Sequence, residues 1–209
     1  MDLSFTEQAG HAAQADAASV ILHPPHDPRR REVEAFVRHI YASRYGAHVQ
    51  DFAPVLVSLR DPDGHIAAAA GYRPAAQMPL FLERYLDAPV ESLLASHGHA
   101  QPPRECIVEI GHLAASRAGE GRRLFFQLGP HLAAQRFRWV VGTATEELRH
   151  LLLRIGIAPL VLGQADPAAL GEEAGHWGSY YDHRPLVLAG QLRQALRHLA
   201  RSAAARARG

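Results

Sequence analysis

An acidic residue inside the most apolar stretch of the sequence is the first candidate for chemistry. Glu109 lies within residues 106–114, with apolar side chains on both sides of it. Such a run predicts a strand that is buried on both faces, where a carboxylate costs several kcal/mol unless it is paired or hydrated. Burial also raises the pKa of a carboxyl group and makes it a proton acceptor near neutral pH. We therefore expect a cleft beside Glu109, and the alternative is a structural ion pair with Arg73 or Arg104.

A histidine follows three residues later in the same strand. His112 would lie on the opposite strand face from Glu109 if the strand were regular. A β-bulge would bring the two side chains together, and Gly111 permits one. His112 is then a candidate second acid or base, and the alternative is a loop histidine with satisfied hydrogen bonds.

The glycine-rich segment after the strand could bind phosphate. Gly119-Glu120-Gly121-Arg122 stands where a helix is predicted to begin, so its backbone N–H groups and the helix dipole can hold an anion. Arginines in and near this turn could also dock an acidic carrier protein. The alternatives are a plain turn and a solvated charged face.

A cluster of aromatic residues near the C-terminus offers a further acid. Trp177, Tyr180 and Tyr181 are followed by Asp182. The cluster could form the wall of a substrate pocket with Tyr181 as general acid, or it could pack the terminal segment onto the sheet.

The elements that must position these residues follow from periodicity and turn chemistry. We predict strands near residues 19–22, 52–59, 65–72, 106–114, 137–143, 158–162 and 186–188. We predict helices at residues 29–45, 88–97, 122–135 (with Pro130 kinking or splitting it), 148–155 and 192–208. Residues 180–185 read as a polar loop. The order indicates one α/β (α+β) domain with an antiparallel N-terminal part and a parallel strand pair near the middle.

Composition excludes several classes of protein. The net charge of +1 argues against a nucleic-acid binder, and all 22 basic residues are arginine, which removes lysine chemistry. A single cysteine excludes intrachain disulfides and multi-cysteine zinc sites. The 14 histidines show no metal-binding spacing, so no metal is expected.

The two ends of the chain differ from its centre. We expect a flexible tail at residues 1–18, a single domain at 19–190, and a basic amphipathic helix or tail at 191–209. No run of about 18 apolar residues occurs, so stable membrane insertion is not expected. No secretory signal pattern is present, which makes a cytoplasmic protein the default expectation.

Several blocks of the sequence are distinctive in combination. They are Gly71–Ala75, Pro79–Leu86, Ile107–Gly111, Arg138–Val141 and Trp177–Tyr181. On these blocks, residues 28–190 resemble the thermostable haemolysin family. More distantly, the chain is similar to the N-acyl homoserine lactone synthases of the GNAT acyltransferase superfamily. Position 112 is His where those synthases have Arg, which counts against a homoserine lactone product.

The resemblance implies a GNAT-like mixed, mostly antiparallel sheet with a splayed parallel strand pair and helices on both faces. It also implies an N-acyltransferase that moves a fatty acyl group to a small-molecule amine acceptor. The donor would be acyl-CoA or the acyl-phosphopantetheine of an acyl carrier protein.

By the same resemblance, each candidate residue acquires a role. The catalytic candidates are Glu109, His112 and Tyr181. Those for the donor are Gly111, Leu113, Ala114, Arg117, Gly119, Gly121 and Arg122. Those for the acceptor are Arg44, Asp51, Arg73, Trp139 and Thr143. The alternatives are a cytolytic, membrane-active protein, as the family name suggests, and a non-catalytic GNAT-like binding module.

Overall fold

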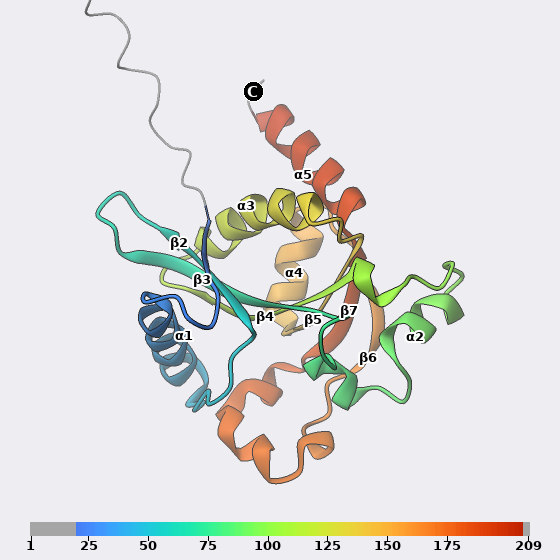
Figure 1. Ribbon diagram of the computed structural model, residues 1–209, viewed down its shortest axis with the longest axis horizontal. Coiled ribbons are helices and arrows are strands. Elements are labelled where there is room, and N and C mark those ends of the chain that lie inside the picture. Colours follow the sequence, from blue (N-terminus) through green and yellow to red (C-terminus); the bar gives the residue numbers. More distant parts are fainter. Residues whose placement is uncertain (1–19, 207–209) are drawn as a thin grey trace, which may run out of the picture.

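A seven-stranded mixed sheet forms the centre of the molecule (Figure 1). The computed structural model describes residues 20–206, so the tail predicted at residues 1–18 lies outside the described residues. The strand order is β1-β2-β3-β4-β5-β7-β6, and only β4 and β5 are parallel neighbours among the described strands. The mixed, mostly antiparallel sheet predicted from the sequence is confirmed.

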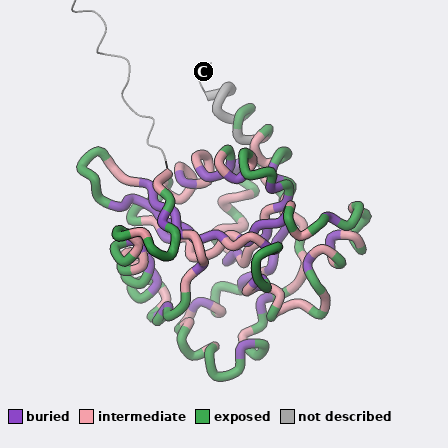
Figure 2. Tube along the Cα trace, viewed as in Figure 1, coloured by how far each residue is buried: buried purple, intermediate pink, exposed green. Residues whose placement is uncertain are grey.

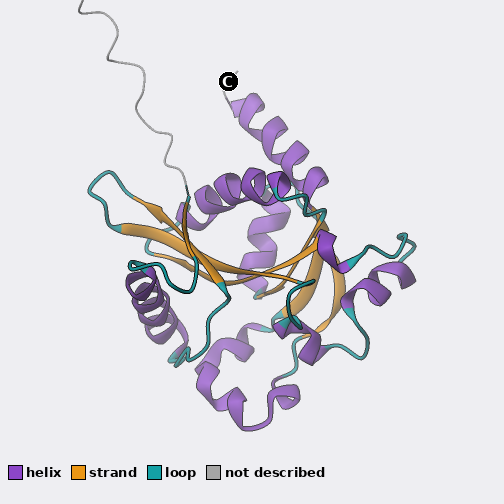
Figure 3. Ribbon diagram, viewed as in Figure 1, coloured by secondary structure: helices purple, strands orange, loops and turns teal. Residues whose placement is uncertain are grey.

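Figure 3 distinguishes the strands of the sheet from the helices around it. The strands are β1 (Ile21–His23), β2 (Val55–Arg60), β3 (Ile66–Pro74), β4 (Ile107–Ala115), β5 (Trp139–Ala144), β6 (Leu160–Gln164) and β7 (Leu186–Gln191). The α-helices are α1 (Arg30–Tyr45), α2 (Val90–Ser96), α3 (Glu120–Ala134), α4 (Glu146–Arg154) and α5 (Leu192–Arg206). The 3₁₀ segments are η1 (Phe81–Tyr85), η2 (Arg104–Cys106) and η3 (Pro167–His183).

Local chemistry sets the ends of the helices around the sheet. Gly46 ends α1 in the left-handed conformation, with φ of 65°. Glycine adopts this conformation without the penalty of a Cβ atom. Thr145 begins α4 because its Oγ1 accepts the Leu148 N–H. Asp27 accepts the Arg29 N–H at 2.8 Å, so it orders the turn before α1 and does not cap the helix directly.

Two of the predicted elements differ from the structure. Residues 180–183 continue η3, and the predicted polar loop is thus mostly helical. α3 starts at Glu120, two residues earlier than predicted. It continues through Pro130 as one helix, so Pro130 does not split it. Pro130 has no backbone N–H and therefore removes one hydrogen bond from α3. It stands in the last turns of the helix, which tolerates this loss.

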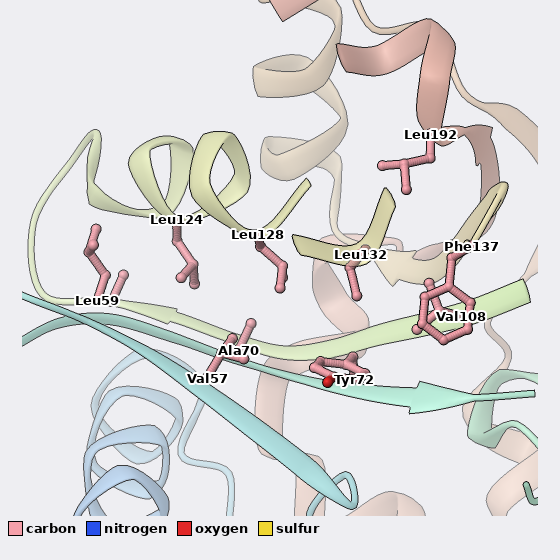
Figure 4. Packing of buried hydrophobic residues seen from close by; sticks show 11 residues of the cluster. Val57, Leu59, Ala70, Tyr72, Val108, Leu124, Leu128, Leu132, Phe137 and Leu192 are labelled. Atoms are coloured by element: carbon pink, nitrogen blue, oxygen red, sulfur yellow. The ribbon is translucent and has the colours of Figure 1, made fainter. Parts of the chain in front are cut away.

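Helices cover both faces of the sheet (Figure 1). On one face, Leu124, Leu128 and Leu132 of α3 point onto β2, β3 and β4, as Figure 4 shows. On the other face, α1 packs against β2 and β3 through Val33 and Val37. Full burial of each such side chain contributes about 1.5–3 kcal/mol. Figure 2 shows that many of the buried residues lie along the central strands, between these helices.

Candidate functional site

Strands β4 and β5 diverge partway along their length. They pair only over Ile107–Glu109 of β4 and Trp139–Val141 of β5, although both strands continue beyond this point. At the last contact, a Cβ atom on Gly142 would lie 2.6 Å from the Ile110 carbonyl oxygen. Glycine thus allows a close approach that no other residue fits, and the strands separate directly after it.

A β-bulge in β4 contributes to this divergence. His112 and Leu113 together lie opposite Ala70 of β3, and the register shifts at this point. His112 has a φ of 54°, a left-handed conformation that is uncommon for residues other than glycine. A bulge bends its strand and increases the local twist, which turns β4 away from β5. The bulge is thus centred at His112, one residue after the glycine that the sequence suggested.

One cavity of about 830 Å³ lies at the divergence. We call the part facing α1, η1 and η3 its polar side, and the part facing α3, α4 and α5 its apolar side. Residues of the polar side include Arg44, Tyr45, His48, Asp51, Arg73, Trp177 and Tyr180. Residues of the apolar side include Phe125, Leu128, Leu132, Leu148, Leu151, Leu152 and Leu196.

Glu109 lies at this cavity and is only 8% exposed. Its Oε2 accepts the Phe81 N–H at 2.8 Å and its Oε1 accepts the Leu82 N–H at 3.0 Å. The carboxylate therefore caps the start of η1. Within residues 20–206, Glu109 forms no ion pair with Arg73 or Arg104, and Arg104 instead binds Glu83 and Glu91.

The surroundings of Glu109 act on its pKa in opposite directions. Burial raises the pKa above its usual value, while the two backbone hydrogen bonds and the charge of Arg73 lower it. The net shift is upward. This is the direction that favours a proton acceptor near neutral pH.

The His112 imidazole is mostly enclosed and neutral. Its Nε2 donates to the Asp51 carbonyl oxygen at 3.1 Å. Because that nitrogen carries the proton, Nδ1 is the bare nitrogen, and it is buried without a partner among the described residues. Burial lowers the pKa of His112 to about 4. His112 thus links the bulge to the segment after α1, and it lines the same cavity as Glu109.

Two arginines of the polar side have different surroundings. Arg44 of α1 forms an ion pair with Glu147 of α4, and both residues line the cavity. Arg73 donates to the Pro79 carbonyl oxygen at 3.4 Å, and its Nε has no partner in the described part of the chain. Arg73 also forms no ion pair there, so its charge is free to meet an anion in the cavity.

Aromatic side chains form much of the polar side. Tyr41, Tyr45, Trp177 and Tyr180 pack together with ring centroids 5.3–6.4 Å apart, and the Tyr41 and Tyr180 rings are stacked while the other pairs meet edge-on or tilted. η3 reaches this position because Gly178 has no Cβ atom. A Cβ there would lie 2.0 Å from the Tyr45 carbonyl oxygen, closer than two such atoms can approach. The close approach closes the cavity at the end of α1.

The glycine-rich turn lies at the cavity where α3 begins. Arg117, Gly119, Gly121 and Arg122 all line the cavity, and no side chain caps the N-terminus of α3. Glu120 is bound by Arg123 at 2.9 Å, which offsets the negative charge next to the turn. The uncapped N–H groups and the two other arginines can therefore hold a phosphate.

Three of the predicted site residues do not line the cavity. Ala114 is buried against α1, because the bulge turns its side chain to that face. Trp139 packs in the core below the divergence, with its ring 4.8 Å from His99. Tyr181 lies behind Tyr85, and their hydroxyl oxygens are 2.7 Å apart. The other predicted residues, Thr143, Gly111 and Leu113 among them, all line it.

Several cavity residues could not be found by the reasoning applied to the sequence. Tyr85 lines the cavity, and its block, Pro79–Leu86, was identified only by resemblance. The leucines of α4 were predicted to lie in a helix and were given no role. None of the α4 residues is buried, and Leu148, Leu151 and Leu152 line the cavity. Only the structure shows that these leucines face a cavity.

A small cluster of possible metal ligands lies elsewhere, in the turn between β2 and β3. Asp61, Asp63 and His65 are close together, and the Asp61 carboxylate already accepts the His65 N–H at 2.8 Å. These residues do not line the cavity. They serve as a hairpin turn.

A family model described as thermostable hemolysin matches residues 23–196. The chain belongs to the thermostable haemolysin family. A comparison with curated proteins found no match.

Solved structures show the GNAT-like fold of this haemolysin family member. TofI, in a ternary complex with an inhibitor and MTA, has a TM-score of 0.56 at 18% identity and covers 86% of this chain and 96% of its own. MesI, a CoA-dependent acyl-homoserine lactone synthase, has a TM-score of 0.53 at 16% identity over 88% and 94%. FeeM, an N-acyl amino acid synthase from uncultured soil microbes, has a TM-score of 0.55 at 11% identity over 85% and 98%.

The family and fold expected from the quoted blocks are confirmed by these matches. Among residues 20–206, no helix combines the length and the apolar character needed to cross a bilayer.

Proposed function

We propose that the protein is an N-acyltransferase that moves a fatty acyl group from a thioester to a small polar amine. The observation that carries this proposal is the cavity at the divergence of β4 and β5. It joins a buried carboxylate, an uncapped helix N-terminus and an apolar region in one space. Those are the three environments that an amine, a phosphopantetheine and an acyl chain require.

The donor lies along the diverging strands in this proposal. β4 has no strand partner on its β5 side beyond Glu109 in the described sheet, so its backbone can pair with the amides of a pantetheine arm. The phosphate then meets Arg117, Arg122 and the first turn of α3. Both acyl-CoA and an acyl carrier protein present this same arm.

The acyl chain occupies the apolar side. Leu148, Leu151 and Leu152 of α4 line the cavity together with α3 and α5, and each retains exposed surface. Covering that surface with a hydrocarbon chain contributes about 25 cal/mol per Å². This supports a fatty acyl group in preference to a short one.

The acceptor enters from the polar side. Glu109 takes a proton from the ammonium, either directly or through a water, because its pKa is raised and each oxygen keeps a second lone pair. The free amine attacks the thioester carbonyl, the C–N bond forms, and the C–S bond breaks to release a thiolate. Backbone N–H groups near Gly111–Leu113 are the donors for the oxyanion. The nitrogen loses its second proton as the C–S bond breaks, and this proton passes to the thiolate and restores the thiol.

The charge distribution on the polar side favours an acceptor that also carries an anion. Arg73 lies opposite Glu109 in the β3–β4 register and lacks a carboxylate partner in the described residues. An amino acid would place its carboxylate at Arg73 and its amine at Glu109. FeeM, which shares the fold, is by name an N-acyl amino acid synthase.

Mass spectrometry of lipid extracts tests the proposal. Cells that express the wild type should contain an acyl-amide that is missing from cells expressing Glu109→Ala. Glu105→Ala is the matched control, because Glu105 is exposed four residues earlier and does not line the cavity. Unchanged lipids, together with lysis of vesicles by the pure protein alone, would instead support the cytolytic alternative. Unchanged lipids without lysis would support the non-catalytic binding module.

A further inference from the structure

The C-terminal helix closes the apolar side of the cavity. Leu192, Ala195 and Leu196 of α5 line it together with residues of α3 and α4. Figure 4 shows Leu192 at the start of α5, above the row of α3 leucines. α5 follows β7 directly, so its first turn is anchored at the sheet, where the Leu192 N–H donates to the Arg138 carbonyl oxygen at 2.9 Å.

A glycine in α3 lets α5 come this close. A Cβ atom on Gly129 would lie 2.8 Å from Leu196 Cδ2 and 4.0 Å from Leu192 Cδ1. The Leu196 side chain therefore rests on the bare backbone of α3, where any larger residue would displace it. Glycine in a helix interior lowers helix stability relative to alanine. The close packing of Leu196 explains why a glycine nevertheless stands at position 129.

α5 also comes close to the end of α4. A Cβ on Gly156, in the turn after α4, would lie 3.7 Å from His198 Nδ1. α5 thus bridges α3 at Gly129 and the end of α4 at Gly156. The inner part of the cavity is bounded by these three helices, and α5 is the last of them in the chain.

We infer that α5 sets the length of the acyl chain, with Leu196 seated over Gly129 as the limiting contact. This rests on the proposed function, in which the acyl chain lies on the apolar side. A chain that grows along α4 meets Leu196 where α3 and α5 touch. Its further methylenes then find no free apolar surface.

Calorimetry tests this inference by measuring how tightly the full-length protein binds acyl-pantetheine thioesters with acyl groups of increasing length. Acyl-pantetheine is the part that CoA and carrier-protein donors share. For the wild type, affinity should rise about fourfold per added methylene until the chain reaches Leu196, and then stop rising.

Leu196→Ala should move this break to longer chains, and Leu196→Trp should move it to shorter ones. For chains about two methylenes past the wild-type break, the alanine variant should bind about fifteenfold more tightly than the wild type. Leu153→Ala is the matched control, because Leu153 is 56% exposed on α4 and does not line the cavity. It should leave the break in place. Thermal unfolding of each variant confirms that it is folded.

The outcomes separate the two proposals. If the wild type binds acyl-pantetheines but the break is the same in all variants, α5 does not set the length, and the proposed function stands. If the wild type binds no acyl-pantetheine of any length, both the acyl donor and the role of α5 are wrong.

Discussion

Arg73 lies opposite Glu109 in the β3–β4 ladder, yet the Glu109 carboxylate is bound by two backbone N–H groups and by no arginine of residues 20–206. The acid is therefore held in place by η1, while the guanidinium remains free for a ligand. An ion pair between the two would have neutralised both groups. The actual arrangement keeps an oriented carboxylate and a free cation side by side at the cavity.

Replacing Glu109 by glutamine should lower both stability and turnover. The amide of Glu109→Gln presents one NH₂ donor to the N–H of Phe81 or Leu82, which leaves a buried donor unsatisfied. We expect the free energy of unfolding to fall by about 1–3 kcal/mol. Turnover should fall by about 10² to 10⁴, because glutamine cannot accept the proton.

Urea unfolding and the rate of acyl-amide formation measure these two effects. Glu105→Gln removes a charge from the same region of the chain at an exposed site and should change neither quantity. Wild-type turnover in Glu109→Gln would show that Glu109 only caps η1.

His112 should make the protein less stable in mild acid. The folded-state pKa of about 4 lies below the usual value of 6.5, so the unfolded chain binds a proton in this interval and the folded chain does not. Stability from this source is present above about pH 6.5 and is lost as the pH falls toward about 4. The shift corresponds to at most about 3.5 kcal/mol.

Urea unfolding of His112→Asn between pH 4 and 7 checks this prediction. Asparagine tolerates the left-handed backbone and does not titrate. The stability of the wild type relative to the variant should decline as the pH falls. Taking this difference removes the contribution of Glu109, whose raised pKa acts in the opposite direction because it makes stability fall as the pH rises. The same substitution at exposed His39 controls for loss of a histidine. A difference independent of pH would contradict the prediction.

A methyl group at Gly142 should disturb the divergence of β4 and β5. The added Cβ would lie 2.6 Å from the Ile110 carbonyl oxygen, and the backbone there must move to admit it. Gly142→Ala should therefore lose about 1–3 kcal/mol of unfolding free energy. On β7, next to β5, a Cβ at Gly190 meets no atom within 4 Å, so Gly190→Ala should lose much less. Equal losses measured by urea unfolding would show that the close contact has no energetic consequence.

Tyr85 should affect turnover more than Tyr181. The Tyr85 side chain lines the cavity, whereas Tyr181 lies behind it at hydrogen-bond distance. Tyr181→Phe should cost about 1 kcal/mol of stability, as expected for one hydrogen bond, with turnover nearly unchanged. Tyr85→Phe removes the hydroxyl of the tyrosine that lines the cavity and should lower turnover more. Comparing the two rates of acyl-amide formation decides the matter, and a larger loss in Tyr181→Phe would restore Tyr181 as the candidate acid.

Elements with strong local signals could be predicted from the sequence. Gly46 at the end of α1 and Thr145 at the start of α4 act through their own backbone or side chain within a few residues. The apolar run around Glu109 likewise predicted β4. In each case the cause lies within one element, so the sequence contains it.

The partners of Glu109 could not be predicted in the same way. They are backbone N–H groups of η1, about 28 residues earlier, and every residue except proline carries such a group. Nothing in the side chains of Phe81 and Leu82 indicates where their N–H groups point. The sequence pointed only to arginines as partners, because side-chain charge is the property that a sequence displays.

The apolar side of the cavity shows a second limit. The leucines of α4 form an apolar face, which ordinarily indicates a face buried against the sheet. Leu148, Leu151 and Leu152 remain partly exposed at a cavity instead. Periodicity reports that a face avoids water, but it does not distinguish a neighbouring helix from a bound hydrocarbon chain.

The docking of η3 onto the end of α1 has a consequence for the order in which the protein matures during synthesis. His48 N–H donates to the His176 carbonyl oxygen, and Ser179 Oγ donates to the Tyr45 carbonyl oxygen 134 residues before it. Chains fold from the N-terminus as they leave the ribosome, and contacts between distant residues form late. When Glu109 and the whole of β4 have left the ribosome, Trp177 and Tyr180 have not yet been synthesised, so the polar side of the cavity lacks their side chains. The polar side of the cavity is therefore completed only when the last fifth of the polypeptide emerges, so that truncated products of interrupted translation carry the carboxylate without an enclosed site.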